Sequence, residues 1–267
     1  MIKNPVDELR AEYAGLIDFL LLDRTTDANI IWATAERPRA QISPSELDLI
    51  EPRFMKGKDR RFKRTKNRAE VFTPPDVCKI QNDLIVEPWI DQPDAFIDAA
   101  FLEIACGEAP YLVSRYNVVD GSTIELDDRI GLLDRKLKLI NELDVDQNDW
   151  QQKARRAYQS IYGYEFQGDN LLIARINLLL SAAEYHRAKF NRPPTSDFMR
   201  ELATVISWNL WQCDGRTLTV PFQEVVVQRA LNGFGDDSSS KREPLPCRIM
   251  DWKNGKTIEL PLLKLRR

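Results

Sequence analysis

Residues Phe101–Tyr111, FLEIACGEAPY, decide the fold that we expect for this chain. A short apolar run ends in an acid, Glu103, and a turn of small residues, Ala105-Cys106-Gly107, follows directly. A run of this kind, bounded by glycine, is typical of a buried strand that brings its backbone close to a ligand. Ala109 occupies the position where a second glycine would give this turn more conformational freedom.

Two further segments repeat the order of apolar run and acid. SIYGYEFQ contains Glu165 and precedes a strong amphipathic helix predicted for Asp169–His186, and TVISWNLWQCDG is a third strand-like unit that ends in Asp214-Gly215. Alternating strands and helices predict an α/β domain with a mainly parallel sheet. Ligands bind outside the carboxyl ends of the strands in such sheets, so we expect these acids to converge there.

The rest of the chain contains further helix, loop and hairpin signals. The expected elements are helices at Pro5–Leu22, after Ser43, at Asp76–Ile85, Glu125–Leu143 and Asp149–Ser160, a flexible polar loop at Gly233–Pro246, and a hairpin at Asn254-Gly255. We therefore expect an N-terminal helical and basic segment at 1–68 and a ligand-binding domain at 69–267. This domain would carry a helical insertion at 118–160 and a C-terminal β-hairpin.

Composition excludes several classes of protein. The cysteines are scattered without a C-x-x-C pair and the chain has a single histidine, so no metal site and reduced thiols are expected. The longest apolar run, Leu16–Leu22, is interrupted by Asp18 and is shorter than the roughly 20 residues of a membrane span. No signal-peptide pattern begins the chain. These features predict a cytoplasmic protein without a membrane partner.

A basic segment, RFMKGKDRRFKRTKNR at 53–68, stands out against the net charge of −3. Any nucleic-acid binding by this chain must come from such a local patch. The candidate phosphate contacts are Arg60, Arg61, Lys63, Arg64 and Lys66. A charge run is also typical of a solvated surface, and the sequence leaves both interpretations open.

Four stretches in order along the chain, AEVFTPPDVCKIQNDLI, FLEIACGEAPYLV, IYGYEFQGDNLLIARINLLL and WNLWQCDG, carry a family resemblance. Together they resemble the cofactor half of the S-adenosylmethionine-dependent DNA adenine-N6 methyltransferases of restriction-modification systems, over roughly residues 65–216. The resemblance implies a Rossmann-like class I methyltransferase sheet, S-adenosylmethionine as cofactor and DNA as partner.

The resemblance also implies roles for particular residues. Phe72, Thr73 and Pro74 would hold the methionine moiety; Glu103, Ala105, Cys106 and Gly107 would form the glycine-rich motif; Glu165, followed by Phe166, would bind the ribose; Asp214 and Gly215 would contact the adenine. Four motifs in the family's order are specific, whereas each alone is weak.

The chain departs from the family at the catalytic motif, Asn/Asp-Pro-Pro-aromatic, which accepts the amine of a flipped adenine. The pair Asp251-Trp252 follows an apolar run near the place where that motif is expected, and is the candidate catalytic pair. Otherwise a protein partner would supply catalytic groups or target recognition. Two functions follow: a DNA adenine methyltransferase, or a catalytically silent cofactor-binding module that assists or regulates a larger DNA-modification assembly.

Overall fold

A small parallel sheet lies at the centre of the protein. The computed structural model describes residues 3–68, 70, 73–227 and 241–260. Strands β3 (Phe101–Glu103), β4 (Ile161–Glu165) and β5 (Leu210–Gln212) are parallel in the order β3-β4-β5. The carboxyl ends of the three strands lie at the same end of the sheet, as the alternation of strands and helices in the sequence predicts. The described residues thus form a mixed α/β fold with a three-stranded parallel sheet.

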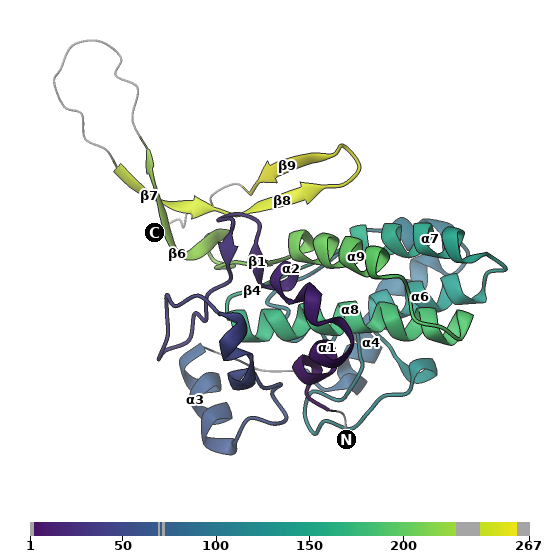
Figure 1. Ribbon diagram of the computed structural model, residues 1–267, viewed down its shortest axis with the longest axis horizontal. Helices are drawn as coiled ribbons and strands as arrows, with labels where there is room; N and C mark the ends of the chain where they lie inside the picture. The colour runs from purple at the N-terminus through teal and green to yellow at the C-terminus, as the bar shows by residue number, and fades with distance from the viewer. Residues whose placement is uncertain (1–2, 69, 71–72, 228–240, 261–267) are drawn as a thin grey trace, which may run out of the picture.

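Helices pack beside this sheet, and the C-terminal hairpins lie above it in Figure 1. The α-helices are α1 (Pro5–Tyr13), α2 (Ile17–Leu21), α3 (Lys58–Arg68), α4 (Pro75–Val86), α5 (Pro93–Asp98), α6 (Leu132–Glu142), α7 (Gln147–Gln159), α8 (Gly168–Phe190) and α9 (Ser196–Asn209). Short 3-10 turns are η1 (Ala14–Leu16), η2 (Pro44–Leu49), η3 (Glu87–Trp89) and η4 (Leu126–Asp128). The helix expected after Ser43 is η2, and Ser43 with Glu46 forms its capping box.

Helix α8 is the central helix of the core. The sequence predicts an amphipathic helix here. This prediction is wrong, because most residues of α8 are buried, on all sides of the helix. The N-terminal helices cover its outer side: Leu9, Leu20 and Leu21 are buried in the same apolar cluster as Ile173 and Leu179. The segment at 1–68 therefore shares the main core with the parallel sheet.

The predicted helical insertion at 118–160 also contributes to the core. Helices α6 and α7 form within it, and Leu133, Leu137 and Trp150 are fully buried. Lys136 of α6 is buried too, and its ammonium donates hydrogen bonds to the carbonyls of Ile97 and Ala99 at 3.1 and 2.6 Å. These two helices are thus integral to the packing of the sheet.

The third strand-like unit is mostly helical. Only Leu210–Gln212 is strand, and the preceding residues end α9. The β-branched residues of TVISWN favour a strand locally, but Phe198, Leu202 and Val205 recur at helical spacing and are buried. Thr195 caps the helix by accepting a hydrogen bond from the Phe198 amide at 3.3 Å. Helical periodicity therefore outweighs local propensity here.

Antiparallel hairpins complete the fold. Strands β1 (Leu22–Asp23) and β2 (Ala28–Asn29) pair near the N-terminus; β6 (Thr219–Val227) pairs with β7 (Lys241–Pro246), and β8 (Arg248–Asp251) with β9 (Lys256–Glu259). The predicted Asn254-Gly255 hairpin is confirmed, with Gly255 at φ 63°. The polar loop expected at 233–246 is strand from residue 241, and residues 233–240 lie outside the described part.

The two edges of the parallel sheet differ. Beside β5, the side chain of Gln212 accepts a hydrogen bond from the Ile31 amide at 2.8 Å and donates one to the Ile31 carbonyl at 2.7 Å. This contact joins the N-terminal segment to the end of β5, and the outward carbonyl of Leu210 accepts hydrogen bonds from Arg175 Nε and Nη2 at 2.9 and 2.6 Å. Strand β3 pairs with β4 alone among the described residues.

A search of the described residues for a helix with the length and hydropathy of a membrane span finds none.

Candidate functional site

The turn after β3 has a tightly wound backbone. Ala105, Gly107 and Ala109 have positive φ angles of 49°, 55° and 63°. The amide of Cys106, between the first two, donates a hydrogen bond to the Tyr164 carbonyl at 2.9 Å. The turn is therefore fixed against the end of β4. Ala109 adopts the left-handed conformation for which glycine is favoured, although its side chain is fully buried.

Glu165 at the end of β4 joins the turn to the start of α8. One carboxylate oxygen accepts a hydrogen bond from the Gly107 amide at 2.9 Å, and the other accepts one from the Gln167 amide at 3.0 Å. Burial raises the pKa of Glu165, because desolvation disfavours the ionised form. Its position next to Gly107 agrees with the expectation that the acids and the turn converge.

Glu103 at the end of β3 has an unsatisfied carboxyl group. Its Oε1 accepts a long hydrogen bond from the Tyr111 amide at 3.4 Å. Oε2 is inaccessible to solvent and has no hydrogen-bond partner among the described residues, although the residue as a whole is only half-buried. Burial raises the pKa of Glu103 well above its usual range. An unpaired buried carboxyl oxygen is costly and is a natural acceptor for a cationic ligand group.

The segment before α4 lies close to Glu103. Pro74 is the N-cap of α4, and the Cys78 thiol contacts the Thr73 carbonyl at 3.6 Å. Burial, and then the nearby Glu103 carboxylate, raise the pKa of Cys78 to about 12, so this thiol is not a ready nucleophile. Thr73 and Pro74 are thus brought toward the turn. Phe72 lies outside the described residues.

Asp214 and Gly215 follow β5 at the same end of the sheet. The Cys213 amide donates to the Glu165 carbonyl at 3.0 Å, which places the start of this turn beside β4. A carboxylate oxygen of Asp214 accepts from the Arg216 amide at 3.0 Å. A Cβ atom on Gly215 would lie 2.6 Å from the Tyr164 ring, so only glycine fits there without a shift. The ring of Phe166 packs edge-on against Phe222.

The candidate catalytic pair lies elsewhere. Trp252 donates a hydrogen bond from its indole to Asn209 Oδ1 at 2.7 Å, and Asn209 bonds to the carbonyls of Tyr158 and Ile161 at 3.0 Å. These contacts are at the amino ends of β4 and β5, opposite the turn. Asp251 instead accepts hydrogen bonds from Lys253 and Asn254 within the hairpin. The structure therefore corrects the expectation that Asp251 and Trp252 act beside the cofactor residues.

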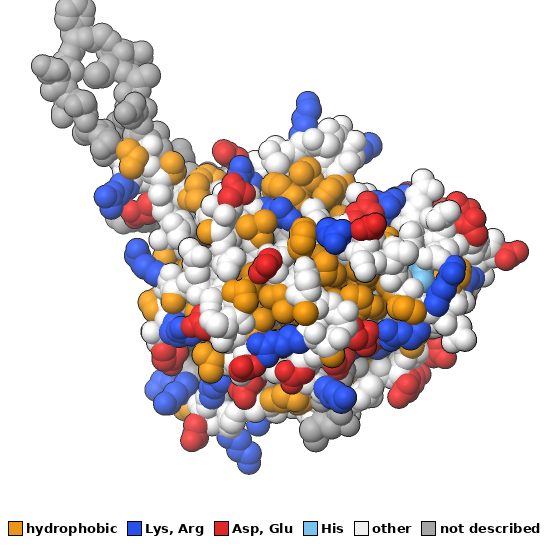
Figure 2. Space-filling model, viewed as in Figure 1, with side chains coloured by type: hydrophobic (Ala, Val, Ile, Leu, Met, Phe, Trp, Pro, Cys, Tyr) orange, Lys and Arg blue, Asp and Glu red, His pale blue; other side chains and the backbone are white. Residues whose placement is uncertain are grey.

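The basic segment forms helix α3. Lys and Arg side chains gather over it at the lower left of the face in Figure 2, with acidic side chains among them. Arg64 is buried, bonds to both carboxylate oxygens of Asp169 at 2.7 and 2.9 Å, and also pairs with Glu70. Lys56 pairs with Asp169 at 3.2 Å. Arg64 is therefore committed inside the protein, which corrects its assignment as a phosphate contact.

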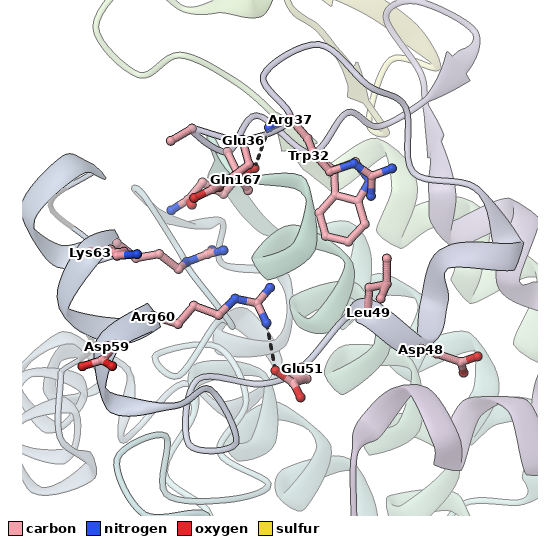
Figure 3. A pocket seen from close by; sticks show the side chains of 13 residues that line it. Trp32, Glu36, Arg37, Asp48, Leu49, Glu51, Asp59, Arg60, Lys63 and Gln167 are labelled. Carbon is pink, nitrogen blue, oxygen red and sulfur yellow. Dashed lines mark hydrogen bonds and ion pairs between the residues drawn. The ribbon is translucent and has the colours of Figure 1, made fainter.

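A cavity of about 620 Å³ lies beside α3. Figure 3 shows Arg60 reaching toward Glu51, an ion pair of 2.9 Å, with Lys63 and Trp32 on opposite sides. Lys63 has no ion-pair partner among the described residues, and Arg61 and Lys66 are at least partly exposed. Gln167 lines the cavity, and its backbone amide donates a hydrogen bond to Glu165. Gln167 thus connects the cavity to the carboxylate that also binds Gly107.

Several contacts at this site were not predicted from the sequence. The Asp169–Arg64–Lys56 cluster connects segments more than 100 residues apart, and the only sequence signal for Gln167 is its position two residues after Glu165. No group of histidine, cysteine, aspartate or glutamate side chains in the described ranges is arranged to hold a metal ion. Comparisons with family models, with curated proteins and with solved structures find no match for this chain.

Proposed function

We propose that this chain binds S-adenosylmethionine at the carboxyl end of its parallel sheet, as the cofactor-binding part of a DNA adenine methyltransferase of a restriction-modification or related system. The observation that carries the proposal is the meeting of Glu103, the Gly107 turn and Glu165 at that end. The family-like order of motifs along the sequence supports the same conclusion. In this proposal the three strands are the cofactor half of a Rossmann-like class I methyltransferase sheet.

The donor and acceptor set at the turn fits this cofactor. The unpaired Oε2 of Glu103 would accept from the methionine ammonium, near Thr73 and Pro74. Glu165 has two carboxylate oxygens for the paired ribose hydroxyls, which would replace its bonds to backbone amides. Asp214 would accept from the adenine amine. When bound, S-adenosylmethionine supplies an electrophilic methyl group for transfer to a nucleophilic nitrogen.

The acceptor half of the reaction has no counterpart in this chain. The sequence lacks the Asn/Asp-Pro-Pro-aromatic motif at the expected place, and Asp251 lies at the amino end of the strands. We therefore favour the cofactor-binding module over the self-sufficient enzyme. The proposed DNA contacts are three basic side chains of α3 that are at least partly exposed, Arg61, Lys63 and Lys66, of which Lys63 lines the cavity.

Titration calorimetry with S-adenosylmethionine tests the proposal. We expect binding by the wild-type chain, and a loss of at least about ten-fold in affinity for Glu165→Gln and for Glu103→Gln, because each removes a charge-assisted hydrogen bond. The matched control is Glu142→Gln, an exposed glutamate on α6. Asp251→Asn is expected to bind as the wild type does.

A methyl-transfer assay on unmethylated DNA separates the two functions. We expect the chain alone to bind the cofactor without transferring its methyl group. Transfer by the chain alone would show a complete enzyme and contradict the module. Absence of any calorimetric signal with S-adenosylmethionine would show that the proposed cofactor is wrong.

A further inference from the structure

Strand β3 has a free hydrogen-bonding edge. The Phe101 amide donates to the Ser160 carbonyl at 2.9 Å, toward β4. Successive residues of a strand point their backbone groups to opposite sides, so the amide and carbonyl of Leu102 face away from β4. Among the described residues no strand lies there. At the opposite edge, the outward carbonyls of Leu210 and Gln212 in β5 accept from Arg175 at 2.9 Å and from the Cys247 thiol at 3.5 Å.

Large apolar side chains are exposed around this edge. Leu102 of β3 and Ile104, directly after the strand, are 54% and 67% exposed. Helix α4 and the residues after it run beside β3 in the opposite direction. Asn82 of α4 donates to the Tyr111 carbonyl at 3.0 Å, the Tyr111 amide donates to Glu103 at 3.4 Å, and Trp89 contacts Phe101 edge-on at 6.5 Å. Along that segment Ile80, Leu84 and Ile90 are 62%, 65% and 71% exposed. We call Ile80, Leu84, Ile90, Leu102 and Ile104 the edge surface.

Among the described residues, the charges around the edge surface that lack an ion-pair partner are acidic, because Lys79, beside Ile80, pairs with Asp83. No lysine or arginine occurs between residues 80 and 114, a range that contains the acids Asp83, Glu87, Asp91, Asp94, Asp98, Glu103 and Glu108. Arginine and lysine from elsewhere in the chain pair with Asp83, Asp94 and Asp98. Glu87 and Asp91, on either side of Ile90, are exposed and have no ion-pair partner in the described part of the chain. An apolar surface with an acidic rim complements an apolar segment with basic flanks.

We propose that the edge surface receives a β-strand from a second, different protein, an apolar strand flanked by lysine or arginine. Main-chain hydrogen bonds to Leu102 would extend the sheet, and the apolar side chains of the strand and its flanking elements would cover Ile80, Leu84 and Ile104. A second copy of this chain is disfavoured, because it would bring the two acidic rims together. Since β3 leads directly into the Gly107 turn, a parallel strand would end beside that turn. A strand that ends there would bring catalytic groups of the partner to a bound cofactor. Only this consequence rests on the proposed function.

Synthetic peptides test the docking without S-adenosylmethionine, so its outcome is independent of cofactor binding. The probe is a short run of valine and isoleucine between lysine pairs, since a strand buried on both faces is continuously apolar. One control peptide has glutamate in place of lysine, and another has N-methyl groups that remove the main-chain donors. We expect the lysine-flanked peptide to bind at least about ten-fold more tightly than either control.

Variants locate the binding surface. Leu102→Asp on β3 and Ile80→Asp on α4 should each weaken binding of the lysine-flanked peptide at least about ten-fold. Val226→Asp on β6, which replaces a side chain that is 56% exposed, is the matched control and should leave binding unchanged. Circular dichroism shows whether each variant is folded, and Ile80→Asp, on a helix surface, keeps the test valid if Leu102→Asp does not fold.

Three results would overturn the proposal. Equal affinity for the lysine-flanked and glutamate-flanked peptides would remove the charge argument. Undiminished binding of the N-methyl peptide would exclude strand addition. A homodimer in sedimentation experiments that Leu102→Asp dissociates would assign the edge surface to a second copy of this chain.

Discussion

At the scale of single residues, the turn after β3 contains two alanines in a conformation that costs them free energy. Ala105 and Ala109 have φ angles of 49° and 63°. A β-carbon in the left-handed region costs roughly 1–2 kcal/mol relative to glycine. The two alanines differ in burial, since Ala105 is exposed and Ala109 is fully buried. This difference allows strain and packing to be separated.

We expect Ala105→Gly to raise the free energy of unfolding by about 0.5–1 kcal/mol, the relief of strain less the greater entropy of the unfolded chain. The free energy of unfolding of Ala109→Gly should be about 1 kcal/mol lower than that of Ala105→Gly, because Ala109→Gly also removes a buried methyl group. Urea denaturation of both variants measures the difference. Equal effects would indicate that burial at residue 109 contributes nothing.

The positions of the acids at the site could largely be predicted from the sequence. Glu103 and Glu165 each end an apolar run, and parallel strands bring such ends together. The partners of those acids could not be predicted, because the hydrogen bond from Gly107 to Glu165 and the unpaired oxygen of Glu103 depend on the path of the turn. The prediction for Asp251 was wrong for a related reason. A local motif does not determine whether a hairpin packs at the amino or the carboxyl end of the strands.

At the scale of elements, helix α3 is held to α8 by buried charges. Asp169 in the first turn of α8 contacts Arg64 and Lys56, and the side chains of Lys56 and Asp169 are fully inaccessible. Although burial opposes ionisation, these two cations hold the pKa of Asp169 well below its usual range. The cluster explains why a strongly basic helix docks onto the core.

We expect Asp169→Asn to lower the free energy of unfolding by about 3–5 kcal/mol, because it leaves the buried Lys56 without its ion-pair partner and Arg64 with Glu70 alone. The control is Glu12→Gln, which breaks the half-exposed ion pair with Arg187 and should cost less than about 1 kcal/mol. Chemical denaturation at neutral pH compares the two. A small effect of Asp169→Asn would mean that α3 is not held by this cluster.

The same carboxylate should shape stability in acid. A folded-state pKa below the unfolded value of about 3.9 contributes stability that is fully present above pH ~4 and is lost as the pH falls through the folded value. The wild-type chain should therefore lose stability more steeply below pH ~4 than Asp169→Asn does. Thermal unfolding followed by circular dichroism across this range gives both slopes, and identical slopes would contradict the assignment.

Elements with a clear helical period were predicted well. Pro75–Val86 matches the helix expected at Asp76–Ile85, and α8 begins within two residues of its expected start. The helix expected at Pro5–Leu22 is interrupted at η1, where Gly15 weakens helical continuity. The error at TVISWN shows that β-branched composition misleads where apolar residues recur with helical spacing.

At the scale of the whole molecule, the net charge of −3 confines any DNA contact to a small surface. On α3, Arg64 is committed to the core and Arg60 pairs with Glu51, which leaves Arg61, Lys63 and Lys66 for phosphates. We expect Arg61→Ala and Lys66→Ala each to weaken DNA binding and to reduce the dependence of log affinity on log salt concentration by about one unit.

Fluorescence anisotropy with duplex DNA at several salt concentrations measures these slopes. Lys256→Ala, on the exposed strand β9 of the C-terminal hairpin, is the control and should leave the slope unchanged. Equal slopes for the α3 variants and the wild-type chain would remove α3 from the DNA interface.

The occupied carbonyls at the β5 edge have a consequence for assembly. Head-to-tail stacking of parallel sheets requires the last strand of one molecule to meet the first strand of the next. The outward carbonyls of Leu210 and Gln212 already accept from Arg175 and the Cys247 thiol, so the β5 edge has no free carbonyl for a neighbouring strand. Addition at β3 therefore terminates after one step, and the protein can form a discrete complex through its sheet without polymerising into a fibre.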